Sequence, residues 1–131
     1  MIKFFTKYKI IFYSSNFILI LLYLFPGSLI GCFLYNDCKL QPQITRDYII
    51  SSNHLYAFAI LSLIGFLTYK NSKKIRYLSA YLITVSIFLE IFHNFIPERS
   101  FEYSDLFGNL AGVIIVLIVF NFLKIYENLK N

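Results

Sequence analysis

The segment Leu106–Leu123 reads LFGNLAGVIIVLIVFNFL and contains no charged side chain. A helix needs about 20 apolar residues to cross the hydrocarbon core of a bilayer, because each residue rises by about 1.5 Å. Its run Val113–Phe120 does not alternate polar and apolar residues, as the strands of a membrane barrel do. No polar stripe follows Asn109, which disfavours a soluble amphipathic helix. The segment therefore predicts a transmembrane helix.

Three further apolar segments precede this one in the chain. Together with it they predict an all-α membrane protein with four transmembrane helices in a single domain, residues 1–131, with spans at about 10–25, 53–69, 77–95 and 105–123. The composition agrees, since 58% of residues are hydrophobic and 15% are charged, against about 25% charged in soluble domains. No small-residue cleavage motif follows the first segment, so we expect a retained span rather than a cleaved signal peptide.

The charged residues between the apolar segments predict the orientation. Lysine and arginine excess marks cytoplasmic segments. Such an excess occurs before the first span, between the second and third spans, and in the tail: Lys3, Lys7 and Lys9; Lys70, Lys73, Lys74 and Arg76; Lys124, Glu127 and Lys130. The other two connections are neutral or acidic. We therefore predict that both ends are cytoplasmic, and because the basic residues form short clusters rather than one solvated face, we expect no nucleic-acid partner.

Ionisable residues are rare and costly beside transmembrane spans, so each is a candidate functional residue. The predicted orientation gathers these residues near the outer surface, and the candidate ligand-binding residues are His54, Glu90, His93, Arg99, Asp105 and Asn109. Helical spacing places Ser86, Glu90 and His93 on one face of the third span. It also places Asp105 and Asn109 on one face of the fourth. Gly108 and Gly112 form a small-residue pair that allows a neighbouring helix to approach closely.

The same residues are also compatible with structural roles. Asp105 suits the start of a helix, where a carboxylate interacts well with the helix dipole. Glu90 could instead form a buried ion pair with Arg99, and His54 could be an interfacial residue without a task. If the protein is an enzyme, Glu90 and His93 are the candidates for the acid and base.

Metal and thiol chemistry give weaker signals. Glu90 and His93 form one E-x-x-H element, but di-iron bundles use two such elements. A mononuclear site completed by His54 and Asp105 is the alternative, and we predict neither a metal nor another cofactor. Cys32 and Cys38 form a disulfide if they face an oxidising compartment, and Cys32 is otherwise an unpaired apolar residue.

The stretch Glu90–Gly112, EIFHNFIPERSFEYSDLFGNLAG, resembles the VanZ-like membrane proteins. That family ends its third span with E-x-x-Q, continues with a proline, an arginine and an aromatic, and opens its last span with D-x-x-x-N-x-x-G. The positions that match this order and spacing are Glu90, Pro97, Arg99, Phe101, Asp105, Asn109 and Gly112, with His54 and Phe58 matching the second span. Two departures stand out. The family's Gln is His93 here, and its D-K pair falls on Ile50 and Ser51.

The resemblance implies a multi-pass protein of the bacterial cytoplasmic membrane with an outward-facing pocket. The founding member of the family is linked to teicoplanin resistance, so the implied ligand is an envelope lipid or glycan head group. A membrane-embedded enzyme and a non-catalytic accessory subunit are the alternatives. The expected partners are the lipid bilayer and this ligand, and the sequence identifies no protein partner.

Overall fold

The computed structural model describes residues 2–131, and the side chains from residue 8 onward. Lys3 and Lys7 contribute to the predicted cytoplasmic excess of positive charge, and they lie outside the residues whose side chains the structure describes. The all-α prediction is confirmed, because the described residues form helices and no strands. The helices are α1 (Ile2–Leu24), α2 (Leu29–Tyr35), α3 (Ser52–Thr68), α4 (Ile75–Phe92), η1 (His93–Phe95) and α5 (Tyr103–Lys130).

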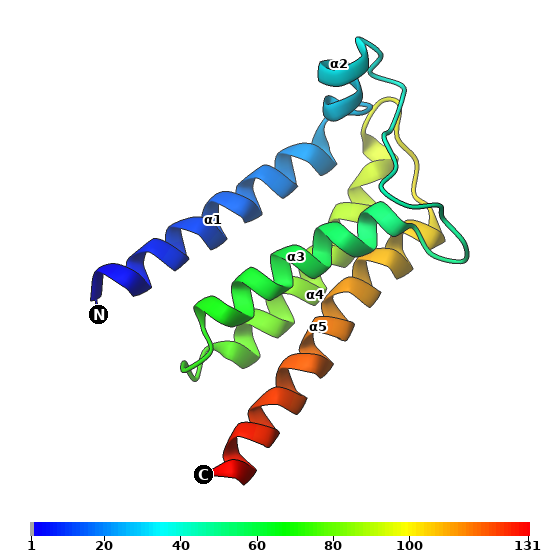
Figure 1. The fold of residues 1–131 in the computed structure, drawn as a ribbon. Helices are drawn as coiled ribbons and strands as arrows, with labels where there is room; N and C mark the ends of the chain where they lie inside the picture. The colour runs from blue at the N-terminus through cyan, green and yellow to red at the C-terminus, as the bar shows by residue number, and fades with distance from the viewer. Residues whose placement is uncertain (1) are drawn as a thin grey trace.

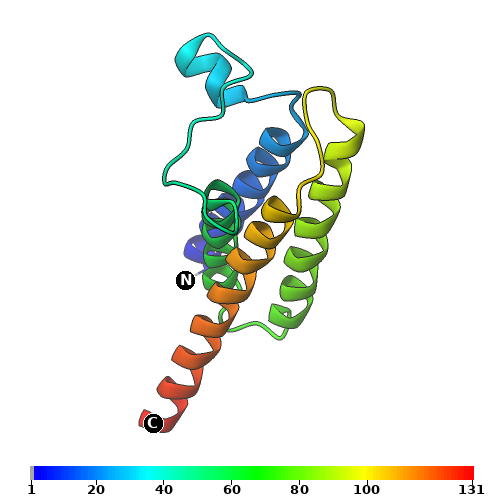
Figure 2. The same cartoon turned by 90° about the vertical axis from the view of Figure 1, so that its right-hand side faces the viewer.

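Helices α1, α3, α4 and α5 form a bundle, and α2 lies at one end of it (Figures 1 and 2). The core contains Phe12, Leu19, Phe58, Leu61, Phe66, Leu82 and Val113. Gly108 and Gly112 bring α5 directly against α3, since a Cβ at Gly112 would lie 2.5 Å from the carbonyl oxygen of Leu55. The predicted close approach at this glycine pair is therefore present.

Helix length and hydropathy identify two segments that can span a bilayer, Ile75–Phe95 and Tyr103–Lys130. A third span is present if Tyr8–Leu24 and Leu29–Tyr35 count as one broken segment. The remaining apolar helix, α3, has 17 residues, which extend over about 26 Å against a hydrocarbon thickness of about 30 Å. Helix α5 continues past the predicted limit at residue 123, because the polar residues that follow are good helix formers.

The chain bends by 84° between α1 and α2. Pro26 cannot donate a backbone hydrogen bond, and Gly27 adopts φ +85°, a value that favours glycine. Ser28 then begins α2, since its Oγ accepts a hydrogen bond of 2.9 Å from the Gly31 amide. Helix α2 therefore does not continue α1 as a straight helix.

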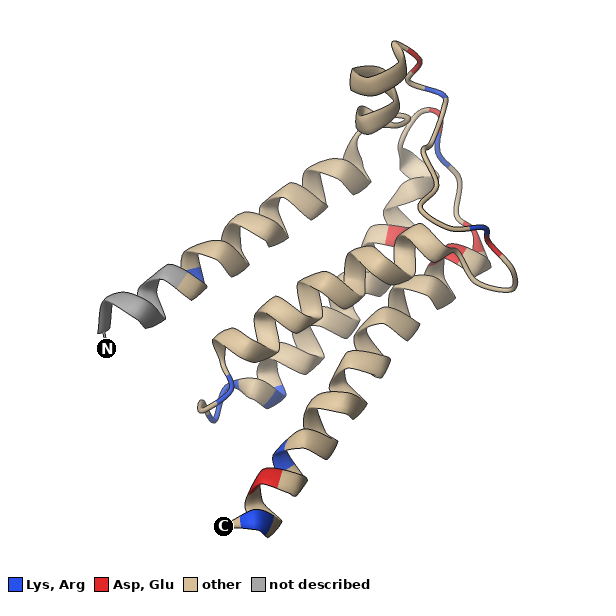
Figure 3. Ribbon diagram, viewed as in Figure 1, with Lys and Arg blue, Asp and Glu red and all other residues tan. Residues whose placement is uncertain are grey.

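Most charged residues lie toward the two ends of the bundle, and few lie in its middle (Figure 3). Lys9, the α3–α4 connection and the end of α5 lie at one end, where Lys70 Nζ contacts Glu127 Oε1 at 2.9 Å. The connections 36–51 and 96–102 lie at the opposite end, where the Ser51 amide donates to the Ser104 carbonyl. The outward faces of the helices carry large apolar side chains, and Ile114, Ile118 and Phe122 form such a stripe on α5. This distribution is typical of helices that contact lipid.

Candidate functional site

Six polar side chains meet where α1, α3, α4 and α5 approach the connections 36–51 and 96–102. We call this group the polar cluster, and its members are Tyr23, His54, Glu90, His93, Asp105 and Asn109. Helical spacing supplies part of the arrangement, because Glu90 and His93 are one turn apart on α4 and η1, and Asp105 and Asn109 are one turn apart on α5. The glycine-mediated contact between α3 and α5 places His54 between these two pairs, and a Cβ at Gly108 would lie 3.1 Å from His54 Cβ.

Asn109 is the fully buried centre of the polar cluster. Its Nδ2 donates to the Ser86 carbonyl at 3.2 Å, which orients the amide. Its Oδ1 accepts a hydrogen bond of 2.6 Å from the Tyr23 hydroxyl and lies 3.0 Å from His54 Nδ1. One side chain thus connects α1, α3, α4 and α5.

Glu90 is also fully buried, and its two carboxylate oxygens have different surroundings. Oε1 accepts a hydrogen bond from the Glu102 amide at 3.1 Å and lies 3.3 Å from His93 Nδ1. Oε2 has no hydrogen-bond partner among the described residues and lies 3.8 Å from His54 Nδ1. A buried carboxylate oxygen without a partner is uncommon, because desolvation of the charge is costly.

Arg99 interacts with the end of α1 rather than with Glu90. Its Nε donates to the Phe25 carbonyl at 2.9 Å, and its Nη2 donates to the carbonyls of Leu22 and Gly27 at 2.9 and 2.6 Å. These carbonyls lie in the last turn of α1 and just beyond it, where a helix leaves acceptors unsatisfied. Arg99 therefore fixes the position of the α1–α2 bend, which is a role that sequence reasoning did not assign to it.

A cleft of about 550 Å³ opens beside the polar cluster, between the end of α1, α2 and α3. His54, Arg99 and Asp105 are the predicted site residues that line it. Its wall combines apolar residues with polar and charged ones: Leu22, Leu29, Ile30, Ala57 and Ile60, and Lys39, Gln41, Asn53 and Glu98. An amphipathic ligand fits such a lining.

The other three predicted residues lie behind the cleft. Glu90, His93 and Asn109 are at most 1% exposed and do not line it. His93 Nε2 lies 3.1 Å from the Tyr23 carbonyl oxygen, and its other nitrogen faces Glu90, so both ring nitrogens contact protein groups. Direct contact of His93 with a ligand in the cleft is therefore not supported by its position.

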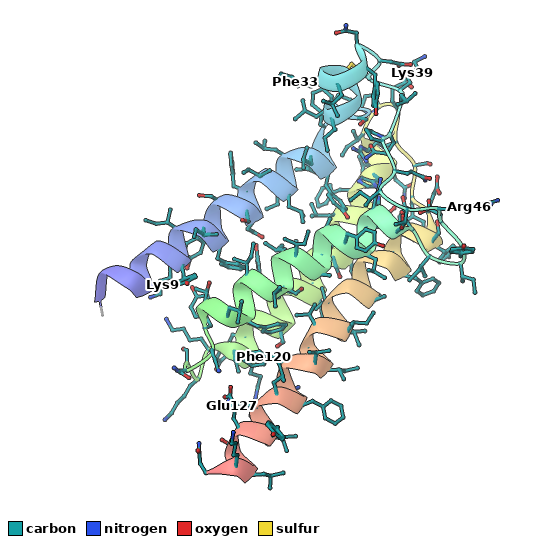
Figure 4. The ribbon with its side chains drawn as sticks, in the orientation of Figure 1. Lys9, Phe33, Lys39, Arg46, Phe120 and Glu127 are labelled. Atoms are coloured by element: carbon teal, nitrogen blue, oxygen red, sulfur yellow. A yellow bond between two sulfur atoms is a disulfide. The ribbon has the colours of Figure 1, made fainter. Side chains whose placement is uncertain are left out.

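Two contributors were missed by sequence reasoning, Tyr23 and Lys39. Tyr23 is one of 11 tyrosines, and nothing in its local sequence distinguishes it. Lys39 lines the cleft and directly follows Cys38, which forms a disulfide with Cys32, the first of the two alternatives for these cysteines. This disulfide closes α2 onto the start of the connection 36–51. Figure 4 shows Lys39 at the same end of the bundle as Phe33 of α2.

His54, Glu90 and Asp105 each offer one potential metal-ligand atom, and these atoms lie within 4.8 Å of one another. His54 Nε2 lies 3.4 Å from Asp105 Oδ2. The absence of a second E-x-x-H element argued against a di-iron site, and a mononuclear site completed by His54 and Asp105 was the alternative. The structure brings these two residues together with Glu90, and His93 is not part of the group.

Comparison of the chain with known protein families, characterised proteins and solved structures finds no match.

Proposed function

We propose that this chain is a four-span membrane protein whose connections 36–51 and 96–102 face the outside. The lysine-rich segments share the opposite end of the bundle, as the ion pair between Lys70 and Glu127 illustrates. The disulfide between Cys32 and Cys38 lies at the predicted outer end, and disulfides persist in oxidising compartments. Two independent features thus support one orientation, and the short α3 crosses the bilayer through local thinning or flanking polar residues.

We further propose that the protein binds the anionic head group of an envelope lipid in the cleft. The observation that carries this proposal is the lining of the cleft, which places apolar residues of α1, α2 and α3 beside Lys39 and His54. Apolar walls accommodate acyl or prenyl chains, while a lysine ammonium attracts a phosphate. Two of the guanidinium nitrogens of Arg99 already donate to α1 carbonyls, so Lys39 is the main cation available to the ligand.

This proposal agrees with the resemblance to VanZ-like proteins. The residues that carry the resemblance occupy two kinds of position: His54, Arg99 and Asp105 line the cleft, while Glu90 and Asn109 support it from behind. A bacterial cytoplasmic-membrane protein that binds an envelope lipid or glycan precursor is the function that this arrangement favours.

The test is binding of a fluorescent polyprenyl phosphate to the full chain in phosphatidylcholine nanodiscs. Lys39→Gln is expected to weaken binding about tenfold, the equivalent of about 1.4 kcal/mol. Lys73→Gln is the matched control, because Lys73 belongs to the connection between α3 and α4, at the end of the bundle opposite to α2 (Figure 1). No saturable binding by the unmodified chain, or an equal loss in both variants, would overturn the proposal.

Acid–base catalysis is the second candidate, and the position of His54 favours it. The imidazole lines the cleft, with Asp105 Oδ2 3.4 Å from Nε2 and Glu90 Oε2 3.8 Å from Nδ1. A histidine between carboxylates is a common general base. Release of inorganic phosphate from the same lipid, abolished by His54→Gln but not by Lys73→Gln, would support catalysis, and retention of intact lipid would argue against it.

A further inference from the structure

We propose that His54, Glu90 and Asp105 form a binding site for one divalent transition-metal ion, with Zn²⁺ as the ion to test. Their ligand atoms lie within 4.8 Å of one another and come from α3, α4 and α5. One imidazole and two carboxylates are ligand types that Zn²⁺ accepts. The proposal does not depend on lipid binding by the cleft.

The hydrogen bonds of Asn109 determine which nitrogen of His54 is free to bind a metal. Since Nδ2 of Asn109 donates to the Ser86 carbonyl, its Oδ1 is the atom that faces His54 Nδ1. An amide oxygen only accepts hydrogen bonds, so Nδ1 of His54 carries the hydrogen and Nε2 carries the lone pair. Metal-binding histidines are typically held in this way, through donation by the second ring nitrogen to a fixed acceptor.

The contact between His54 and Asp105 then requires a cation or a proton between the two side chains. An unprotonated Nε2 and the Asp105 carboxylate are both acceptors, yet Nε2 and Oδ2 lie 3.4 Å apart. Two ligands bound at about 2.0–2.1 Å to a tetrahedral Zn²⁺ lie roughly 3.4 Å from each other. A shared metal ion accounts for this separation, and a proton on the imidazole or on the carboxyl group is the competing explanation.

Glu90 supplies an independent observation that points to a ligand. Its side chain is completely buried, its Oε1 is held by the Glu102 amide and faces His93, and its Oε2 has no partner among the described residues. Oε2 faces the His54 ring at 3.8 Å from Nδ1. Because Arg99 is engaged with α1, no arginine or lysine of the described region forms an ion pair with this carboxylate. A metal ion would neutralise it and occupy the bare oxygen.

The site would remain accessible from outside, since His54 and Asp105 line the cleft and Glu90 lies behind them. Three protein ligands with one open position are typical of zinc sites that bind an exchangeable ligand. A phosphate oxygen of a lipid head group is suited to that position. Only this last step rests on the proposed function.

The experiment measures zinc bound to the purified full chain in detergent. The protein is stripped with chelator, incubated with ZnSO₄, desalted and assayed by elemental mass spectrometry. We expect about one zinc per unmodified chain, and at least a tenfold lower affinity in His54→Ala and Asp105→Asn. Glu98→Gln is the matched control, because it makes the same carboxylate-to-amide change on the cleft wall outside the cluster.

Two further measurements keep the test decisive if a variant fails to fold. Zinc should raise the thermal unfolding temperature of the unmodified chain, because binding to the folded state stabilises it. Co²⁺ should give visible absorption bands that Zn²⁺ displaces. Folded, unmodified chain that binds less than about 0.1 zinc, or equal losses in Glu98→Gln and Asp105→Asn, would overturn the metal site. Zinc binding without lipid binding would instead overturn only the head-group proposal.

Discussion

At the scale of single residues, Arg99 illustrates a difference between sequence position and structural task. Its place in a motif-like stretch suggested an anion-binding residue or a partner for Glu90. The structure shows three hydrogen bonds from its guanidinium to carbonyls at the end of α1. The residue lines the cleft, but its hydrogen-bond partners are backbone atoms more than 70 positions away, which no local pattern encodes.

Replacement of Arg99 by Gln should therefore lower stability as well as ligand binding. Hydrogen bonds to a charged donor contribute about 1.5–3 kcal/mol each, and their losses at one site are not additive. We expect the free energy of unfolding in detergent to fall by about 3 kcal/mol. Arg46→Gln, in the exposed part of the connection 36–51, is the control and should change stability little. A stable Arg99→Gln protein that lacks only ligand binding would contradict the capping role.

Asp47 carries a pH prediction for the connection 36–51. Its Oδ1 accepts a hydrogen bond of 2.7 Å from the Ser52 amide, and its Oδ2 accepts one of 2.9 Å from Gln43. The first of these bonds is the main reason why the pKa of Asp47 lies below its usual value. Since the folded-state pKa is lowered, the stabilising contribution is present above the ordinary aspartate pKa and is lost as the pH falls through the folded value.

We thus expect the connection to loosen only in acid below the ordinary pKa of aspartate, because the carboxylate becomes protonated as the pH falls through its lowered folded-state pKa. Limited proteolysis between residues 41 and 51 with an acid-active protease measures the change. Asp47→Ala, which removes both acceptor oxygens, should show the loosened connection already at neutral pH, with little further response to acid. An Asp47→Ala protein with the protection and acid response of the unmodified chain would show that this hydrogen bond does not hold the connection.

At the scale of helices, the close approach of a neighbouring helix to Gly108 and Gly112 is the feature that sequence predicted best. Gly108 and Gly112 stand one turn apart, and this spacing indicated close approach of a neighbouring helix. The spacing does not say which helix approaches. In the structure the approaching helix is α3, which carries His54. The pairing of Asp105 with His54 therefore depends on how the whole bundle packs.

Gly112→Ala should test this contact directly. The added Cβ would lie 2.5 Å from the Leu55 carbonyl oxygen and 2.8 Å from the Ala59 nitrogen, both backbone atoms. The helices must separate, and we expect a loss of about 1–3 kcal/mol, as for other overpacked sites. Val119→Ile is the control, because it adds one carbon to an exposed position of the same helix. Equal thermal unfolding temperatures for both variants would argue against the close contact.

Other features of the helices were less accessible to sequence reasoning. Pro26 and Gly27 interrupt the helix after the first apolar segment, but hydropathy alone does not give the angle between α1 and α2. The 84° bend depends on the Arg99 hydrogen bonds and on the backbone bond from Ser28 to the Cys38 carbonyl. Residues far apart in the chain therefore fix the shape of the cleft, whereas the apolar pattern fixes only the helices that surround it.

At the scale of the whole molecule, the two ends of the bundle differ in chemistry. One end carries lysine-rich segments and the pair between Lys70 and Glu127. The other carries the disulfide, the polar cluster and the cleft. Sequence predicted this separation because charges alternate between successive connections, and the structure places the described basic segments together (Figure 3). Which end faces the cytoplasm is a separate question, since helix packing has no information about the membrane.

Cysteine labelling in intact cells should answer it. In a chain with Cys32 and Cys38 replaced by alanine, Glu102→Cys should react with a membrane-impermeant maleimide, because we propose that the connection 96–102 faces the outside. Lys73→Cys, in the connection between α3 and α4 at the opposite end of the bundle, should react only after permeabilisation. This expectation follows from the positive-inside rule, because the short connection that contains Lys73 has an excess of lysine and arginine. Labelling of both positions before permeabilisation would mean that residues 73 and 102 lie on the same side of the membrane. In that case α4 would not span the bilayer, and the cleft could not be assigned to the side opposite the lysine clusters. A reversed pattern would retain the bundle but place the cleft in the cytoplasm, where the disulfide between Cys32 and Cys38 would be reduced.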